Sequence, residues 1–238
     1  MRFINYFRKS VPVATPYPGN EDAQQRYYKK LRLQVLIAAL LSHSLYYVCR
    51  TTLNVVKEPI LDNGALNATQ LGMIGSAMLF VYAVGKFVNG FLADYSNIKR
   101  FMAAGLILSA AANLIIGIAG FLNGDGYIGN AIFFLTFIIL WGINGWAQSM
   151  GGPPGIVSLS RWYPLSTRGT YYGFFSASHN LGEFFSFLFV GAIVGLCGWH
   201  WGFAGSAVAG AIGIAIIIAL LHDSPESKGL PPIEVLTD

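Results

Sequence analysis

The chain has 238 residues, of which 54% are hydrophobic and 11% are charged. An average soluble domain carries about 25% charged residues, so this composition excludes a disordered chain and leaves too little polar surface for an ordinary soluble domain. The net charge is +4 and the mean hydropathy is +0.54. A lipid bilayer is the solvent that accommodates so much apolar surface. The two cysteines, Cys49 and Cys197, are too few for a disulfide framework and match no metal-ligand spacing.

The first 32 residues are polar and basic, and prolines interrupt them, so one continuous helix is not expected there. No apolar core with a small-residue cleavage site follows Met1, and we predict no cleavable signal. Residues 21–30 are compatible with a short interfacial helix that leads into the membrane. We therefore predict a separate N-terminal segment over 1–32.

Six long apolar stretches follow, each close to the ~20 residues that a helix needs to cross a bilayer. Their predicted bounds are 33–52, 71–93, 101–121, 128–150, 169–196 and 201–221. The stretches do not alternate and are about twice as long as a barrel strand, which argues against strands. The sequence therefore predicts an all-α membrane protein with six transmembrane helices over 33–221. An amphipathic interfacial segment is predicted over 153–168, and a polar, proline-rich linker over 222–238.

The basic residues are distributed unevenly along these spans. If six helices alternate, 12 of the 15 basic residues lie on one side of the membrane. They are Arg2, Arg8, Lys9, Arg26, Lys29, Lys30, Arg32, Lys99, Arg100, Arg161, Arg168 and Lys228. By the positive-inside rule both termini are predicted to be cytoplasmic. The basic excess is thus a topology signal, and no nucleic-acid partner is predicted.

An ionisable side chain inside a span is costly and is a candidate functional group. Arg50 either snorkels to the outer interface or, if the helix continues toward Pro59, stays inside the first span. His43, Tyr46 and Tyr47 lie seven, four and three positions before it, which predicts one shared helical face. A planar guanidinium framed by tyrosines is suited to bind phosphate or carboxylate.

Three more residues inside the spans have two interpretations each. Lys86 either snorkels or is a second cation in a polar cavity. His179 and Glu183, four residues apart, are either a packing pair or a protonatable contact to a substrate, with Glu183 as a tuning or proton group. No other metal ligands accompany this pair, and no catalytic triad or nucleotide loop is present, so we predict no metal, no cofactor and no enzyme.

The link between the second and third spans is short and patterned. It contains Gly90 and Asp94, followed by the basic pair Lys99 and Arg100. Asp94 is either simply solvated, or caps the next helix, or pairs with a basic group from a neighbouring span.

Several short motifs, in this order and spacing, resemble the organophosphate:phosphate antiporter branch of the major facilitator superfamily. The similarity covers about residues 26–234. The motifs include YYVCR at 46–50, YAVGKF at 82–87, DYSN at 94–97, SHNLG at 178–182 and DSPES at 223–227. This branch contains bacterial hexose-phosphate and glycerol-3-phosphate transporters and a related hexose-phosphate sensor.

The resemblance implies the N-terminal six-helix half of a major facilitator fold in the bacterial inner membrane. It implies exchange of a phosphorylated sugar or glycerol phosphate for inorganic phosphate. By the same resemblance, Arg50 binds the phosphate, Lys86 lines the cavity, His179 contacts the substrate, and Tyr46 and Tyr47 lie near the arginine.

The resemblance also implies a conformational loop formed by Gly90, Asp94, Lys99 and Arg100. Glu183 departs from the family pattern, which has glycine there, and a carboxylate repels phosphate unless it is protonated or paired. The family has twelve spans, so a second six-helix half, in the same or a separate chain, is an expected partner. A sensor that signals to a kinase and a truncated, non-transporting fragment remain alternatives.

Overall fold

The structure is a computed structural model and describes residues 6–13 and 17–237. Part of the predicted N-terminal segment, with Arg2, lies outside the described residues, as does Asp238.

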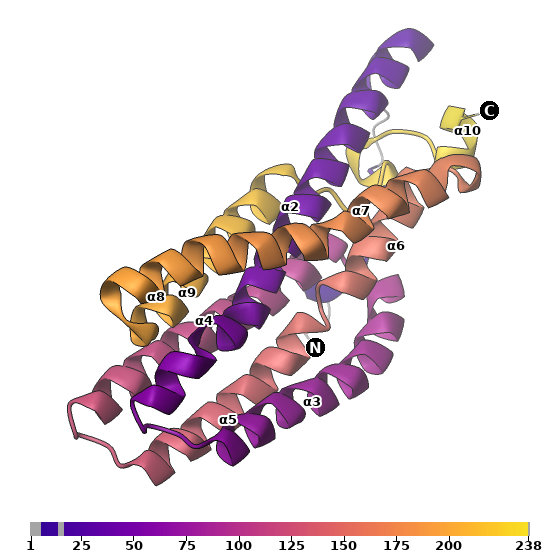
Figure 1. Ribbon diagram of the computed structural model, residues 1–238. Helices are drawn as coiled ribbons and strands as arrows, with labels where there is room; N and C mark the ends of the chain where they lie inside the picture. Colours follow the sequence, from indigo (N-terminus) through magenta and orange to yellow (C-terminus); the bar gives the residue numbers. More distant parts are fainter. Residues whose placement is uncertain (1–5, 14–16, 238) are drawn as a thin grey trace.

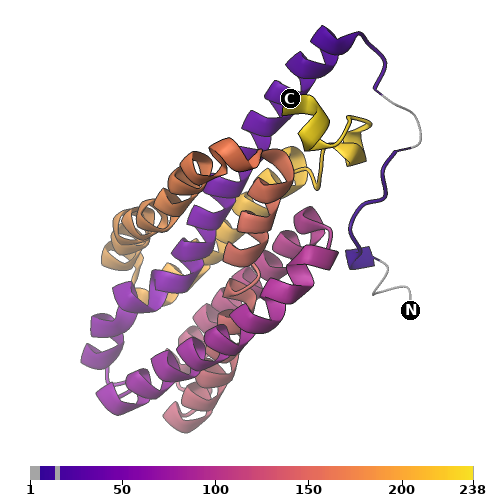
Figure 2. The ribbon, with the colours of Figure 1, turned by 90° about the vertical axis from the view of Figure 1, so that its right-hand side faces the viewer.

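Within the described residues, six helical segments are long and apolar enough to cross a membrane. They are α2 (Glu21–Asp62), α3 (Ala68–Tyr95), α4 (Ile98–Gly124), α5 (Asn130–Gln148) with α6 (Gly152–Trp162), α7 (Leu165–Phe185) with the π-helix η1 (Ser186–Val190) and α8 (Gly191–Cys197), and α9 (Trp199–Leu220). The short helices η2 (Glu226–Lys228) and α10 (Ile233–Thr237) follow. The long helices lie side by side as one bundle (Figures 1 and 2). The prediction of an all-α membrane protein with six spans is confirmed.

The first helix is longer than predicted. It begins at Glu21, because the Asn20 side chain accepts a hydrogen bond from the Ala23 amide (3.1 Å) and caps the first turn. It runs through Pro59 to Asp62, so the predicted interfacial helix at 21–30 is the start of the first span. Arg50 consequently lies inside the helix, three turns before its end.

The first part of the segment predicted to be interfacial, residues 153–162, is helical and packs in the bundle. Helix α6 continues the fourth span to Trp162, and Pro153 and Pro154 lie in its first turn, where a missing amide proton costs no hydrogen bond. Trp162 is fully buried, and its indole donates to the His222 carbonyl (3.1 Å). Packing of its apolar face thus makes this stretch part of the bundle.

The segment predicted as a polar linker folds back onto the bundle. Leu230 and Leu236 are buried in the same apolar cluster as Tyr28 and Trp162. Burial of these two leucine side chains stabilises the packing of the C-terminal segment against the long helices.

Helices α2 and α7 approach closely at Gly182. A Cβ atom at this position would overlap the Ser44 carbonyl oxygen and the Tyr47 side chain. Glycine is required here because the obstructing atoms include backbone, which cannot rotate away. The contact fixes the distance between the two helices.

Gly182→Ala is expected to lower the free energy of unfolding by about 1–3 kcal/mol, because the added methyl group must push α2 and α7 apart. Thermal unfolding in detergent, followed by circular dichroism, measures the change. The matched control is Gly173→Ala on the same helix, where a Cβ atom meets nothing within 4 Å. Equal stability of the two variants would contradict the close approach described here.

Candidate anion-binding site

Three side chains of α2 form one face of the helix, namely His43, Tyr47 and Arg50. Intervals of four and three residues keep them within one helical stripe. All three are partly exposed, whereas their neighbours Ser44, Val48 and Cys49 are buried. This stripe therefore faces away from the packed core and carries a cation.

Arg50 and Lys86 meet at a single aromatic ring. The Arg50 guanidinium carbon lies 4.2 Å from the centroid of the Tyr82 ring and 5.4 Å from that of Tyr47. The Lys86 Nζ lies 5.0 Å from the same Tyr82 centroid. The ring faces attract both cations and hold them in one place. Tyr82 was not predicted as a site residue, although its position four residues before Lys86 was the available signal.

Helix α7 supplies the opposite wall. Nδ1 of His43 lies 2.7 Å from the Ser178 hydroxyl oxygen, and its ring stacks on Phe175 at 4.8 Å. Because the Ser178 hydroxyl donates to the Phe175 carbonyl (2.5 Å), His43 is the donor to Ser178. The His179 ring lies 5.8 Å from the Tyr47 ring. The predicted residues Arg50, Lys86, Tyr47 and His179 are thus brought together.

The two cations have no carboxylate partner. Among residues 6–13 and 17–237, an ion pair joins Arg161 to Asp223 and none involves Arg50 or Lys86. Glu183 is exposed and forms no hydrogen bond or ion pair with His179 in this part of the chain. Two cations on one ring, in an apolar bundle, form a site suited to an anion.

Tyr46 does not lie with this group. Its side chain is 1% exposed, and its hydroxyl donates to the Met102 carbonyl on α4 (2.5 Å). One residue of helix rotates a side chain by about 100°, which directs Tyr46 into the core while Tyr47 faces the site. Tyr46 therefore packs α2 against α4.

A buried polar network lies behind Arg50. The carbonyl of Cys49, the preceding residue, accepts hydrogen bonds from the side-chain amides of Asn113 (3.1 Å) and Asn144 (3.4 Å). Ser109 in turn donates to the Asn144 side-chain oxygen (2.6 Å). Helices α4 and α5 thereby hold the backbone that carries Arg50. Uncharged asparagines inside apolar spans were the signal for this network.

The conformational loop predicted around Asp94 lies where α3 ends at Tyr95 and α4 begins at Ile98. The Asp94 side chain is exposed, and its carbonyl accepts from Arg161 (2.9 Å). Lys99 donates to the Ile218 carbonyl (2.5 Å), and Arg100 lies over the Tyr6 ring at 4.5 Å. A Cβ atom at Gly90 meets nothing within 4 Å. The structure thus gives this loop contacts through its basic residues and its backbone.

Capping and pairing, two of the roles considered for Asp94, fall to other residues. Asn97 accepts from the Arg100 amide (3.0 Å) and caps α4. Asp223, 4% exposed, accepts from Arg161 (2.5 Å) and from the amides of Ile98 (2.9 Å) and Ser10 (2.8 Å). The sequence places Asp223 in the DSPES motif and in the predicted linker over 222–238, and neither predicts its central position at this end of the bundle.

We call the end of the bundle that carries Lys99, Arg100, Arg161, Arg168 and Lys228 the basic end. Burial, together with the nearby charges of Lys228 and Lys99, lowers the pKa of His222 at this end to about 4. Its imidazole is therefore neutral at neutral pH. Burial likewise raises the pKa of Tyr163, whose hydroxyl donates to the Arg32 carbonyl (3.0 Å).

The sequence matches the Major Facilitator Superfamily over residues 39–235. The chain belongs to the major facilitator superfamily. Its similarity to solved structures agrees: it superposes on a bacterial homologue of the human lysosomal transporter Spinster with a TM-score of 0.63, at 19% identity over 82% of this chain and 44% of that one. The proton:xylose symporter XylE gives a TM-score of 0.65, at 14% identity over 86% of this chain and 50% of that one.

Curated relatives identify the branch of the superfamily. The chain is 31% identical to a probable hexose phosphate transport protein of Chlamydia pneumoniae, over 90% of this chain and 45% of that protein. It is 32% identical to the glycerol-3-phosphate transporter of Bacillus subtilis, over 97% of this chain and 50% of that protein. It is 30% identical to the membrane sensor protein UhpC of Escherichia coli, over 89% of this chain and 45% of that protein.

These relatives confirm the resemblance to the organophosphate:phosphate antiporter branch. The chain spans about half the length of the curated relatives that it matches. An integral membrane protein of a transporter family is thus shown.

Proposed function

We propose that the chain binds phosphate-bearing small molecules and forms the N-terminal half of an organophosphate:phosphate antiporter. The observation that carries the proposal is the pair Arg50 and Lys86, which share the Tyr82 ring without a carboxylate partner. A dianionic phosphate neutralises both charges at once. The curated relatives support the same class of ligand, since their names include hexose phosphate and glycerol 3-phosphate.

Each side chain has a distinct role in the proposed site. The planar Arg50 fork donates two parallel hydrogen bonds to phosphate oxygens, and Lys86 adds a point charge. The rings of Tyr47 and Tyr82 orient the guanidinium so that its N–H edge remains available. His179, beside Tyr47, is positioned for the organic part of the ligand or for a phosphate oxygen.

Transport is proposed to follow from movement of two six-helix halves about this site. A second half, in the same or a separate chain, covers the open face of α2, α3 and α7 and completes the cavity. Exchange of one phosphate compound for another drives the cycle, so no hydrolysis is required. We place the basic end in the cytoplasm of a bacterial cell, in the inner membrane, since basic residues are enriched on the cytoplasmic side.

A sensor is the second candidate, and Glu183 favours it. Glu183 lies one helical turn after His179, whose ring lies beside Tyr47, so an ionised carboxylate there repels a phosphate at the two cations. A sensor would bind the same phosphate compounds but would signal to a partner and would not transport them. Flux in vesicles that contain this chain together with its second half supports the antiporter. Binding without flux in the same vesicles, together with co-purification of a kinase, supports the sensor.

Lys86→Gln is expected to weaken phosphate binding about tenfold, because one charge-assisted hydrogen bond is lost while Arg50 remains. Binding of radiolabelled inorganic phosphate to the purified chain in a sugar-based detergent measures the effect. The matched control is Lys57→Gln, an exposed residue of α2 with the same charge change. Equal affinities of the two variants would exclude Lys86 from the site.

A further inference from the structure

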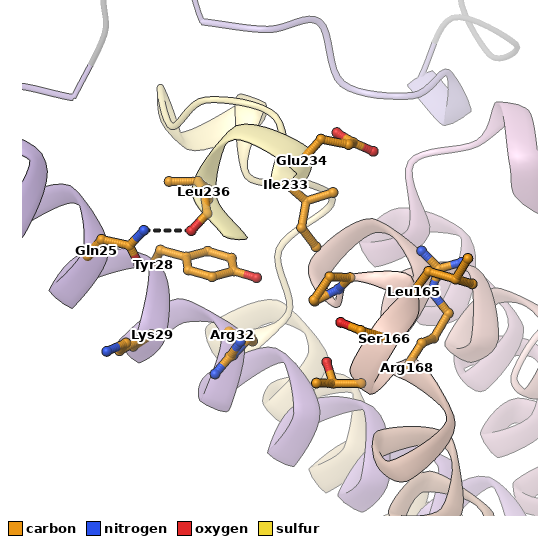
Figure 3. A pocket seen from close by; sticks show the side chains of 12 residues that line it. Gln25, Tyr28, Lys29, Arg32, Leu165, Ser166, Arg168, Ile233, Glu234 and Leu236 are labelled. Carbon is orange, nitrogen blue, oxygen red and sulfur yellow. Dashed lines mark hydrogen bonds between the residues drawn. The ribbon is translucent and has the colours of Figure 1, made fainter. Parts of the chain in front are cut away.

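A basic cavity lies between α2 and α7 at the basic end of the bundle. It has a volume of about 630 Å³ and is bounded by the first turns of α2, the start of α7 and the helix α10 (Figure 3). The site around Arg50 does not include it.

The lining of this cavity favours an anion. Lys29, Arg32 and Arg168 supply three cations, and Glu234 supplies one carboxylate. Figure 3 shows Lys29 and Arg32 on one turn of α2, with Ser166 and Arg168 across the cavity on α7. Among the described residues, the three cations lie in no ion pair with a carboxylate. Ser166 and Thr167 add exposed hydroxyl groups that can donate to an oxyanion.

Aromatic rings hold Arg32 in place. Its guanidinium carbon lies 5.3, 5.2 and 5.8 Å from the ring centroids of Tyr28, Tyr163 and Tyr171. This arrangement matches that of Arg50 between Tyr47 and Tyr82. In both places the rings orient a guanidinium that has no carboxylate partner.

The two arginines also lie on the same face of α2. Arg32 and Arg50 are 18 residues apart, which is about five helical turns and about 27 Å along the axis. Lys29 and Tyr47 have the same spacing. Between the two sites, Tyr171 and Phe175 of α7 contact this face, the first at Arg32 and the second at His43. A continuous seam between α2 and α7 therefore joins the two sites.

We propose that the cavity at Lys29 and Arg32 is a second phosphate-binding site, at which an organophosphate or inorganic phosphate binds at the basic end before it reaches, or after it leaves, Arg50. Its place on a transport route rests on the proposed function, whereas phosphate binding at Lys29 does not. The headgroup of an anionic phospholipid has the same phosphate chemistry and is the other source of the ligand.

The test counts phosphate bound per chain, with radiolabelled inorganic phosphate and a delipidated sample in a sugar-based detergent. Wild-type protein is expected to bind two. Lys29→Glu is expected to retain the Arg50 site and to weaken the second site at least about tenfold, because the charge is reversed inside the cavity. Lys30→Glu is the matched control, since Lys30 is exposed and lies outside the cavity lining.

Arg50→Gln separates the two proposals. If Arg50→Gln loses the phosphate of the Arg50 site and Lys29→Glu loses the phosphate of the second site, both proposals are supported. Loss in Lys29→Glu alone supports the second site and contradicts the proposed function. One phosphate in wild-type protein, or equal binding by Lys29→Glu and Lys30→Glu, overturns the second site.

Added phosphatidylglycerol distinguishes the sources of the ligand. If it displaces one phosphate from wild-type protein and none from Lys29→Glu, the cavity binds a lipid headgroup through the same phosphate chemistry. If both phosphates remain bound, the cavity selects the soluble ligand.

Discussion

Arg50→Lys is expected to reduce phosphate binding at the central site by about 100-fold, although it preserves the charge. Lysine lacks the planar fork that donates two parallel hydrogen bonds to an oxyanion, and it stacks less well on tyrosine rings. Arg50 uses both properties, since its guanidinium lies 4.2 Å from the Tyr82 centroid. Binding of radiolabelled phosphate in detergent measures the loss, and phosphate exchange in vesicles should fall with it.

The control for this variant is Arg26→Lys, which makes the same substitution at an exposed position of the same helix. It should bind phosphate as the wild-type protein does. If Arg50→Lys also retains near-normal binding and exchange, a point charge is sufficient, and the bidentate role of Arg50 is wrong.

Asp223→Ala is expected to lower the free energy of unfolding by about 3–5 kcal/mol, because it leaves the Arg161 guanidinium without its partner in a buried position. The ion pair spans 2.5 Å between side chains that are 9% and 3% exposed. The same change removes the acceptor for the Ile98 and Ser10 amides. Thermal unfolding in detergent measures the loss.

Asp94→Ala is the control, since Asp94 is exposed and contributes its backbone carbonyl to Arg161. Its effect should stay within about 0.5 kcal/mol. The double variant Asp223→Ala with Arg161→Ala should lose less than the sum of the two single changes, because the unpaired charge is gone. A larger effect at Asp94 than at Asp223 would assign the central role at the basic end to Asp94.

The number and type of the spans could be read from the sequence, because a run of about 20 apolar residues has no other stable arrangement in a bilayer than a helix. The ends of the helices could not. Residues 21–32 look polar enough to lie outside the membrane, yet the Asn20 cap starts a helix that continues unbroken to Asp62. Helix α6 carries the helical backbone on to the buried Trp162, within the stretch predicted to be interfacial.

The cations of the candidate site could also be found from the sequence, since Arg50 and Lys86 interrupt apolar runs and are costly there. Their meeting at Tyr82 depends on where α3 lies relative to α2, which the packing of α3 against α5 and α6 determines and no spacing within one helix does. Tyr46 and Tyr47 also show that the sequence pattern does not determine which neighbouring helix a side chain meets. Both were predicted near Arg50, but a rotation of about 100° between neighbours sends the Tyr46 hydroxyl to Met102.

The sequence by itself determined that this protein is a helical membrane protein, which residues are costly in its spans, and which family its motifs resemble. These features are local, because each depends on the composition or order of a short segment. The tertiary structure alone decided that Asp223 pairs with Arg161, that Tyr82 holds two cations, and that Lys29 and Arg32 line a cavity with Arg168. Each of these contacts joins segments far apart in the chain, so its energy depends on the packing of whole helices.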